Sequence, residues 1–182
     1  YILIVLGGSK VQLRESVKYI LINIVSSVLF VAAVALLYAV TGTLNIAHLG
    51  ARVAEVGQGP LLTVIAILFL IVFGLKGALF PLFFWLPGSY AAPPAVVSAI
   101  FGALLTKVGI YSIFRTFTVI FNHQPEITHQ LMVILGAITM LLGVIGAVSH
   151  WDVKKILVYN VVTAVGFIIF GIAAFTTTSF AG

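Results

Sequence analysis

The sequence predicts an all-α membrane protein, a polytopic bundle of transmembrane helices. Of its 182 residues, 62% are hydrophobic and only 7% are charged, and the mean hydropathy is +1.28. Mostly apolar runs of about 18 residues or more recur along the whole chain, which is the pattern of membrane-spanning helices. Because lipid offers no hydrogen-bond partner to an open backbone, each span must be helical.

The first six residues, Tyr1 to Leu6, are apolar but too few to cross a bilayer. We expect them to be the end of a sixth helix, most of which precedes Tyr1. No basic segment or cleavage site accompanies them, which argues against a signal peptide. Five complete spans are expected after them, each long enough at 1.5 Å per residue to cross about 30 Å of hydrocarbon. These spans are residues 17–40, 60–86, 94–121, 129–148 and 156–175.

The links between the expected spans are mostly short. Pro87-Gly88-Ser89-Tyr90 predicts a turn between the second and third spans, because proline and glycine favour turns. The longest link, residues 41–59, has some amphipathic character and is expected to lie on the membrane surface.

The basic residues outside the spans predict the orientation. Alternating spans place five of them on one side of the membrane and two on the other, so the positive-inside rule makes the first side cytoplasmic. The predicted cytoplasmic loops are residues 7–18, 87–93 and 149–155. The five residues are Lys10, Arg14, Lys18, Lys154 and Lys155, and the two are Arg52 and Arg115.

The net charge of +5 has the same explanation. In a soluble protein this excess of cations would suggest nucleic-acid binding, but here short loops that set the orientation carry most of them. Nucleic-acid binding is therefore not expected. The absence of cysteine from the sequence excludes disulfides, thiol catalysis and cysteine–metal sites.

Lys76 and Lys107 are the most informative residues, because no other charged residue lies between Glu55 and Arg115. An ammonium group at mid-membrane costs about 2.5–3.5 kcal/mol on insertion scales, so such groups usually serve a function. Both lysines are expected about 21–25 Å from the turn that joins their helices, and hence at similar depth. The alternative is structural: fixed partners hold each lysine, and neither one titrates.

A break in the second span supports a functional role for Lys76. Pro81 has no N–H, so the carbonyl of Gly77 loses its helical partner. Gly74 and Gly77 flank the lysine and loosen the same stretch. One helix is therefore predicted to be broken at Gly77–Pro81, next to an ionisable group, which is the arrangement of mid-membrane sites in transporters.

The two lysines are expected to influence each other. Two ammonium groups about 10 Å apart repel by about 1.7 kcal/mol at an effective dielectric constant near 20. A proton that arrives at one lysine therefore favours loss of the proton from the other. Thr106, Ser98 and Tyr111 are candidates for a hydrogen-bonded relay between them, although ordinary helix packing also explains these residues.

No acidic residue is placed to neutralise a mid-membrane lysine, so the counter-charge is expected from outside the chain. The four acids, Glu15, Glu55, Glu126 and Asp152, fall at span edges or in links. The histidines are His48, His123, His129 and His150, and no pair has convincing metal-ligand spacing. No metal site and no cofactor are therefore predicted.

Two segments resemble a known family. Residues 76–94, which read KGALFPLFFWLPGSYAAPP, and residues 102–111, which read GALLTKVGIY, are similar to the antiporter-like membrane subunits of respiratory complex I and of Mrp-type sodium/proton antiporters. Asp152 begins a third matching segment, DVKKILVYN. The form WLPGSY followed by APP resembles the Mrp branch of the family most. Complex I relatives often carry histidines in place of Phe83 and Tyr90, a departure that removes two possible proton carriers.

The resemblance implies a fold of about fourteen helices with two inverted five-helix repeats. Residues 1–121 would run from the end of the fifth helix through the eighth, which forms most of the first half-channel. Residues 122–182 would form the ninth and tenth helices, at the start of the second repeat. In the family, the lysine that matches Lys76 pairs with a glutamate of the fifth helix, and the lysine that matches Lys107 passes protons onward.

The resemblance also implies a function. The expected protein is a proton-translocating subunit of a multi-subunit sodium/proton antiporter in a prokaryotic plasma membrane, and not an enzyme. Its expected partners are other subunits, the lipid bilayer, protons and sodium. One alternative is a redox-driven proton-pumping subunit of complex I or a related hydrogenase. The other is a structural membrane subunit whose lysines never titrate.

Overall fold

The computed structural model describes residues 2–5, 7–57, 59–121 and 125–179, and every regular element in these ranges is helical. Five helical segments are long and apolar enough to cross a membrane, as the sequence predicts. The helices are α1 (Lys10–Thr41), α2 (Ile46–Val56), α3 (Pro60–Gly77), α4 (Leu86–Ala91), α5 (Ala95–Ile100), α6 (Thr106–Val119), α7 (Pro125–Val148) and α8 (Val153–Ser179). Ile2–Ile4 and Leu82–Trp85 form 3₁₀ turns, and Phe101–Leu105 forms a π-helical segment.

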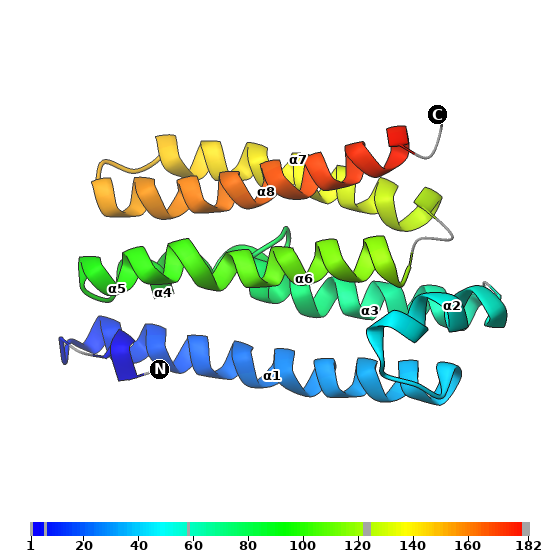
Figure 1. Cartoon of the computed structure of the whole chain (residues 1–182). Coiled ribbons are helices and arrows are strands. Elements are labelled where there is room, and N and C mark those ends of the chain that lie inside the picture. Colours follow the sequence, from blue (N-terminus) through cyan, green and yellow to red (C-terminus); the bar gives the residue numbers. More distant parts are fainter. Residues whose placement is uncertain (1, 6, 58, 122–124, 180–182) are drawn as a thin grey trace.

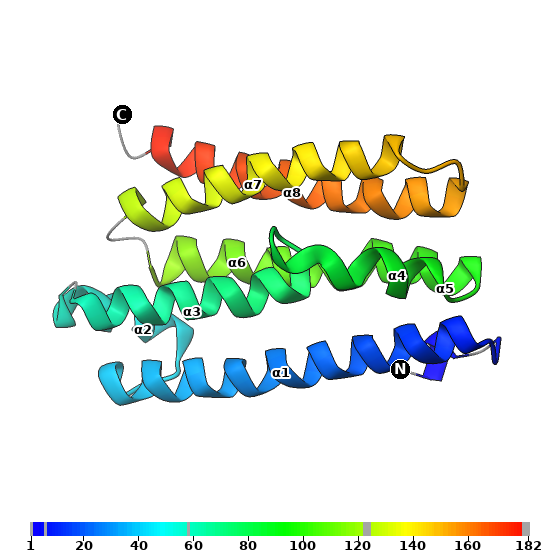
Figure 2. The same cartoon turned by 180° about the vertical axis from the view of Figure 1, so that it is seen from behind.

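The long helices run side by side in three tiers (Figure 1, Figure 2). Helix α1 forms one outer tier, the broken helix α3–α4 and the helix α5–α6 form the middle tier, and α7 pairs with α8 in the third. The start of α1, the α4–α5 turn and the α7–α8 loop lie at one end of the bundle, whereas α2 lies at the other. We call the end of the bundle that contains the start of α1, the α4–α5 turn and the α7–α8 loop the loop end.

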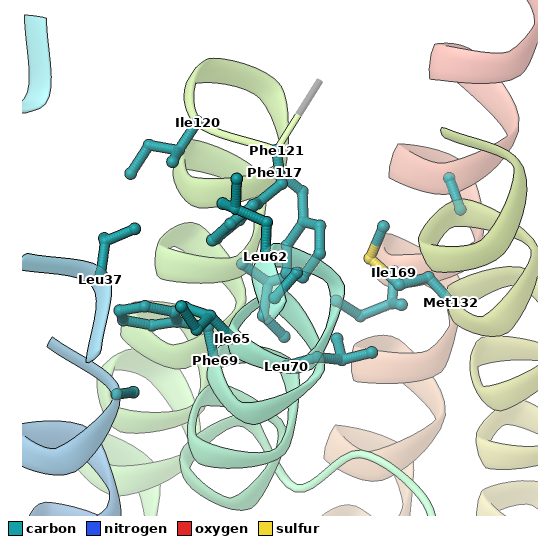
Figure 3. Close-up of a cluster of buried hydrophobic side chains, with 14 of the residues drawn as sticks. Leu37, Leu62, Ile65, Phe69, Leu70, Phe117, Ile120, Phe121, Met132 and Ile169 are labelled. Atoms are coloured by element: carbon teal, nitrogen blue, oxygen red, sulfur yellow. The ribbon is translucent and has the colours of Figure 1, made fainter. Parts of the chain in front are cut away.

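Apolar side chains fill the space between the tiers. Leu62, Ile65 and Phe69 of α3 pack against Phe117 of α6, and Met132 of α7 extends the same cluster (Figure 3). The outward faces of α1 and α7 carry large apolar side chains as well, which is normal for helices that face lipid.

The predicted turn at Pro87-Gly88-Ser89-Tyr90 is wrong. These residues belong to helix α4, and the chain turns at Ala92–Pro94 instead. Pro87 lies in the first turn of α4, where a helix does not need its N–H, so the proline does not interrupt the helix. The expected loop 87–93 is therefore helical over most of its length.

The expected loop 7–18 is also shorter than predicted. Helix α1 begins at Lys10, because Ser9 and Gln12 form a reciprocal capping box at its start. The link at residues 41–59 contains helix α2, which buries Leu49 and Val53 and so has the amphipathic character expected of it. The expected helix end at the start of the chain is described only in part, as the 3₁₀ turn Ile2–Ile4, and Tyr1 and Leu6 lie outside the described residues.

The predicted break is confirmed. Helix α3 ends at Gly77, and Ala78 takes a left-handed conformation with φ of 62°. After the 3₁₀ turn, α4 continues toward the loop end, so the two halves together make one span, Pro60–Ala91. The third span also departs from a regular α-helix, at the π-helical segment. No pattern in the sequence predicts that second departure.

Candidate functional site

Lys76 lies in the last turn of α3, directly before the break. Its Nζ donates a hydrogen bond to Oδ1 of Asn23 on α1, at 2.6 Å. The Nδ2 of Asn23 donates in turn to the carbonyl of Tyr19, at 2.8 Å. This second bond fixes the orientation of the amide, so that its oxygen faces the lysine.

A cavity of about 360 Å³ surrounds this pair, and we call it the Lys76 cavity. Its walls come from α1, α3 and α6, together with Trp85 of the 3₁₀ turn. Asn23, Ser27 and Ser112 provide polar groups, while the aromatic rings of Phe30 and Phe73 are among its apolar walls. The volume exceeds that of several water molecules.

The break itself is held by specific hydrogen bonds. The backbone N–H groups of Ala78 and Leu79 both donate to the carbonyl of Gly74. Nε1 of Trp85 donates to the carbonyl of Leu75 at 3.1 Å. These contacts satisfy carbonyls that the end of α3 would otherwise leave bare in an apolar medium.

The neighbouring helix α7 also supports the break, because the N–H of Phe80 donates to Oγ1 of Thr139 at 2.9 Å. The sequence predicts that the carbonyl of Gly77 loses its helical partner. In the structure, the carbonyls that accept the hydrogen bonds at the break are those of Gly74 and Leu75. Gly74 and Pro81 therefore lie where the sequence places them, and part of the hydrogen bonding around them comes from a residue far along the chain.

Lys107 lies one residue after the start of α6, directly beyond the π-helical segment. Its Nζ donates to the carbonyl of Gly102 at 2.7 Å. Gly102 belongs to the π-helical segment, where backbone carbonyls leave the regular α-helical pattern. The hydroxyl of Thr106 also points to this carbonyl, at 3.5 Å.

A second cavity, of about 450 Å³, surrounds Lys107, and we call it the Lys107 cavity. It lies between α5–α6 and α8. Ser98, Lys154 and Asn160 line it, and so does Tyr90 of α4. Nζ of Lys154 donates a hydrogen bond to the carbonyl of Pro93 in the α4–α5 turn.

The structure brings the backbones of the two lysine segments together but separates their side chains. A Cβ added at Gly109, two residues after Lys107, would lie 3.0 Å from the carbonyl carbon of Lys76. The lysines are therefore at similar depth, as the sequence predicts. Their side chains nevertheless line different cavities.

The relay candidates occupy different surroundings. Thr106 is buried and Ser98 lines the Lys107 cavity, where its hydroxyl donates to the carbonyls of Pro93 and Pro94. Tyr111 is 62% exposed and lines neither lysine cavity.

Within the described part of the chain, neither lysine forms an ion pair. Glu15 pairs with Lys18 at 3.2 Å and Glu55 pairs with Arg52 at 3.0 Å. Asp152 caps the start of α8 by accepting from the backbone N–H of Lys154. The side chain of Glu126 lies outside the described residues. The partners of Lys76 and Lys107 in the structure are thus an amide oxygen and a backbone carbonyl.

The described histidines line neither lysine cavity. His129 is buried near the start of α7, and His150 stacks on Tyr159 with its ring centroid 5.2 Å away. His48 lies on α2, and His123 lies outside the described residues. Among the described residues, no group of three potential metal ligands comes together.

Two contributions to the site are not predicted from the sequence. Asn23 accepts the hydrogen bond from Lys76, and Lys154 lines the Lys107 cavity. A signal exists for Asn23, since an amide is rare within so apolar a span and polar groups in a membrane need partners. The sequence indicates Lys154 only as a determinant of orientation, because its contact with Pro93 joins residues 61 positions apart. No local pattern in the sequence reveals that contact.

Comparisons with known proteins agree with this architecture. The chain is 61% identical to a Na(+)/H(+) antiporter subunit of Bacillus subtilis over all 182 residues, and it spans 37% of that relative. Its structure resembles a chain of the Mrp complex from Dietzia sp. with a TM-score of 0.83, at 35% identity, over 91% of this chain and 30% of that one. It also resembles a chain of respiratory complex I from Thermus thermophilus, with a TM-score of 0.79 at 25% identity, over 90% of this chain and 35% of that one.

A family model describes the whole chain. It is the model of the transmembrane part of NADH:quinone oxidoreductases and Mrp antiporters, and it matches residues 1–182. The bundle, the break and the identities reported above are consistent with that match. The chain belongs to the NADH:quinone oxidoreductase/Mrp antiporter transmembrane family.

Proposed function

We propose that this chain is part of the proton-translocating subunit of a multi-subunit sodium/proton antiporter, and that Lys76 and Lys107 carry protons within it. The name of the Bacillus subtilis relative supports antiport, and the Mrp complex supports assembly with other subunits. The partners proposed are those subunits, the lipid bilayer, protons and sodium. The membrane is a prokaryotic plasma membrane, and the loop end of the bundle faces the cytoplasm.

The observation that carries the proposal is the position of Lys76 in the last turn of α3, directly before the helix break, where it lines a cavity with polar groups on its walls. Its Nζ donates to Oδ1 of Asn23 at 2.6 Å. An ionisable group beside a broken membrane helix is the arrangement of mid-membrane transport sites.

Replacement of Lys76 tests the proposal. The variant Lys76→Ala is made in the full-length subunit, and the complete antiporter is assembled in membrane vesicles. We expect sodium-dependent proton exchange to be lost while the amount of assembled complex stays unchanged. Lys155→Ala is the matched control, because that lysine lines neither lysine cavity, and it should exchange at the parental rate. Retained exchange in Lys76→Ala would contradict the proposal.

The same vesicles separate the alternatives. The complex I match supports a redox-driven pump of the same fold, and proton movement that needs an electron donor instead of a sodium gradient would favour it. A purely structural role predicts that Lys107→Met lowers the amount of assembled complex but leaves exchange per complex intact. We expect the opposite for Lys107→Met: normal assembly and lost exchange.

A further inference from the structure

A cluster of four buried aromatic rings borders both lysine cavities, and we call it the aromatic partition. Tyr19 and Trp85 line the Lys76 cavity, and Tyr90 lines the Lys107 cavity. The rings of Trp85 and Tyr90 meet edge to face, with centroids 5.8 Å apart. Phe101 packs on both tyrosines, at 6.2 Å from Tyr19 and 5.7 Å from Tyr90. The contact between Trp85 and Tyr90 thus joins a wall of one lysine cavity to a wall of the other.

Tyr90 is the notable member of the partition. Its side chain is 1% exposed, and its hydroxyl has no hydrogen-bond partner among the described residues. A buried hydroxyl without a partner costs free energy, so such a group is expected to have a use. The Nε1 of Trp85 already donates to the carbonyl of Leu75, and the ring of Phe101 has no polar atom.

We infer that the Tyr90 hydroxyl passes protons across the aromatic partition, between the Lys76 cavity and the Lys107 cavity. The inference rests on the proposed function, and it supplies the connection that the separation of the two cavities requires. A hydroxyl suits this place because it accepts one hydrogen bond while it donates another. It can pass a proton without carrying a charge of its own.

The transfer conserves protons and bonds. In this transfer, water delivers a proton released by the Lys76 ammonium to the Tyr90 oxygen, and the hydroxyl's own proton passes on to the neutral amine of Lys107. One O–H bond forms as the other breaks, so the tyrosine is neutral before and after the transfer. Rotation of the hydroxyl about its C–O bond then restores the starting state.

Tyr90→Phe is the direct test, because it removes the hydroxyl and keeps the ring that packs on Trp85 and Phe101. In the complete antiporter in vesicles, we expect exchange per assembled complex to fall roughly a hundredfold or more, the size of a lost proton-transfer group. The solvent deuterium isotope effect on exchange should rise, because proton transfer becomes rate-limiting. Tyr38→Phe is the matched control, since that tyrosine is 54% exposed and lines neither lysine cavity, and it should leave both quantities unchanged.

Tyr90→His distinguishes proton passage from packing. An imidazole both donates and accepts hydrogen bonds, so this variant should restore most of the exchange that Tyr90→Phe loses. If both variants lose exchange equally, with no change in the isotope effect, the role of Tyr90 is structural and the inference is overturned. Parental exchange in Tyr90→Phe overturns it as well.

Comparison of Lys76→Ala with Tyr90→Phe distinguishes failure of the proposed function from failure of the role of Tyr90. Lost exchange in Lys76→Ala together with normal exchange in Tyr90→Phe would leave the proposed function standing and remove only the role of Tyr90. If Lys76→Ala retains exchange, the proposed function fails. A raised isotope effect in Tyr90→Phe would still support the hydroxyl as a proton-passing group.

Discussion

At the scale of single residues, the site depends on polar groups that have neutral partners. Lys76 donates to an amide and Lys107 donates to a backbone carbonyl. Both acceptors stabilise an ammonium group without a full negative charge. Each contact holds the ammonium group at a defined place in its cavity.

Asn23 is therefore expected to position Lys76. The variant Asn23→Leu removes the acceptor while roughly preserving side-chain volume. A hydrogen bond to a charged group contributes about 1.5–3 kcal/mol, so we expect exchange to fall about 10- to 100-fold. Sodium-dependent exchange in vesicles, normalised to assembled complex, measures the effect.

Ser27→Ala is the control for Asn23→Leu. Ser27 lines the same cavity one turn along α1, but its hydroxyl donates to the backbone carbonyl of Asn23 instead of contacting the lysine. Its variant should stay within about twofold of the parental rate, the effect of one neutral hydrogen bond at the low end of its range. Equal losses in both variants would show that cavity polarity, rather than the contact with Lys76, controls the rate.

At the scale of elements, two interrupted helices make a close contact near their irregular stretches. Helix α3 stops at Gly77, and the third span passes through a π-helical segment shortly before Lys107. Gly109 allows the close approach, because a Cβ there would lie 2.9 Å from Cα of Gly77. Close backbone packing at small residues is a usual way for membrane helices to associate.

Gly109→Ala is predicted to force α3 and α6 apart. Overpacking of this kind costs about 1–3 kcal/mol, and because the displaced backbone includes Lys76, exchange should fall together with stability. The thermal midpoint of the purified complex and the exchange rate measure the two effects.

Gly171→Ala provides the matched control for Gly109→Ala. Gly171 lies in helix α8, and a Cβ added there meets no other atom within 4 Å among the residues that the structure describes. Alanine favours a helix more than glycine does, so this variant should be neutral or slightly stabilising. A parental thermal midpoint in Gly109→Ala would argue against close contact between α3 and α6 at this depth.

At the scale of the whole molecule, a side-chain contact joins the outer α7–α8 tier to the loop end of the middle tier. Lys154 of α8 donates to the carbonyl of Pro93 in the α4–α5 turn, and it lines the cavity that also contains Lys107. Its place at the start of α8 is at the loop end of the bundle. Its neighbour Lys155 lines a different cavity, with Glu15 and His150.

Lys154→Met should loosen this contact and open the Lys107 cavity to water at the loop end. The chain has no cysteine, so a cysteine placed by Ser98→Cys reports on access to the cavity in otherwise cysteine-free subunits. We expect a water-soluble thiol reagent to label it roughly tenfold faster when Lys154 is replaced, as for a lost hydrogen bond of about 1.5 kcal/mol. Lys155→Met should leave the rate unchanged, and equal acceleration by both variants would show an effect of net charge alone.

Much of this fold follows from the sequence because its strongest signals are local. Hydropathy determines the five spans, and Pro81 with its neighbouring glycines determines the break. The π-helical segment and helix α4 do not follow from the sequence, since each depends on packing against other helices. Pro87 shows the difference well, because the same residue favours a turn or a first helical turn according to what surrounds it.

The sequence by itself determined that this is a helical membrane protein with two lysines at matched depth, one of them beside a broken helix. Apolar length and isolated charge suffice for that conclusion, because a bilayer penalises every alternative. Only the tertiary structure decided where the lysines point: Lys76 toward Asn23, and Lys107 into a separate cavity beyond the aromatic partition. Those contacts depend on how whole helices pack, because the groups that surround each lysine come from segments far apart in the chain.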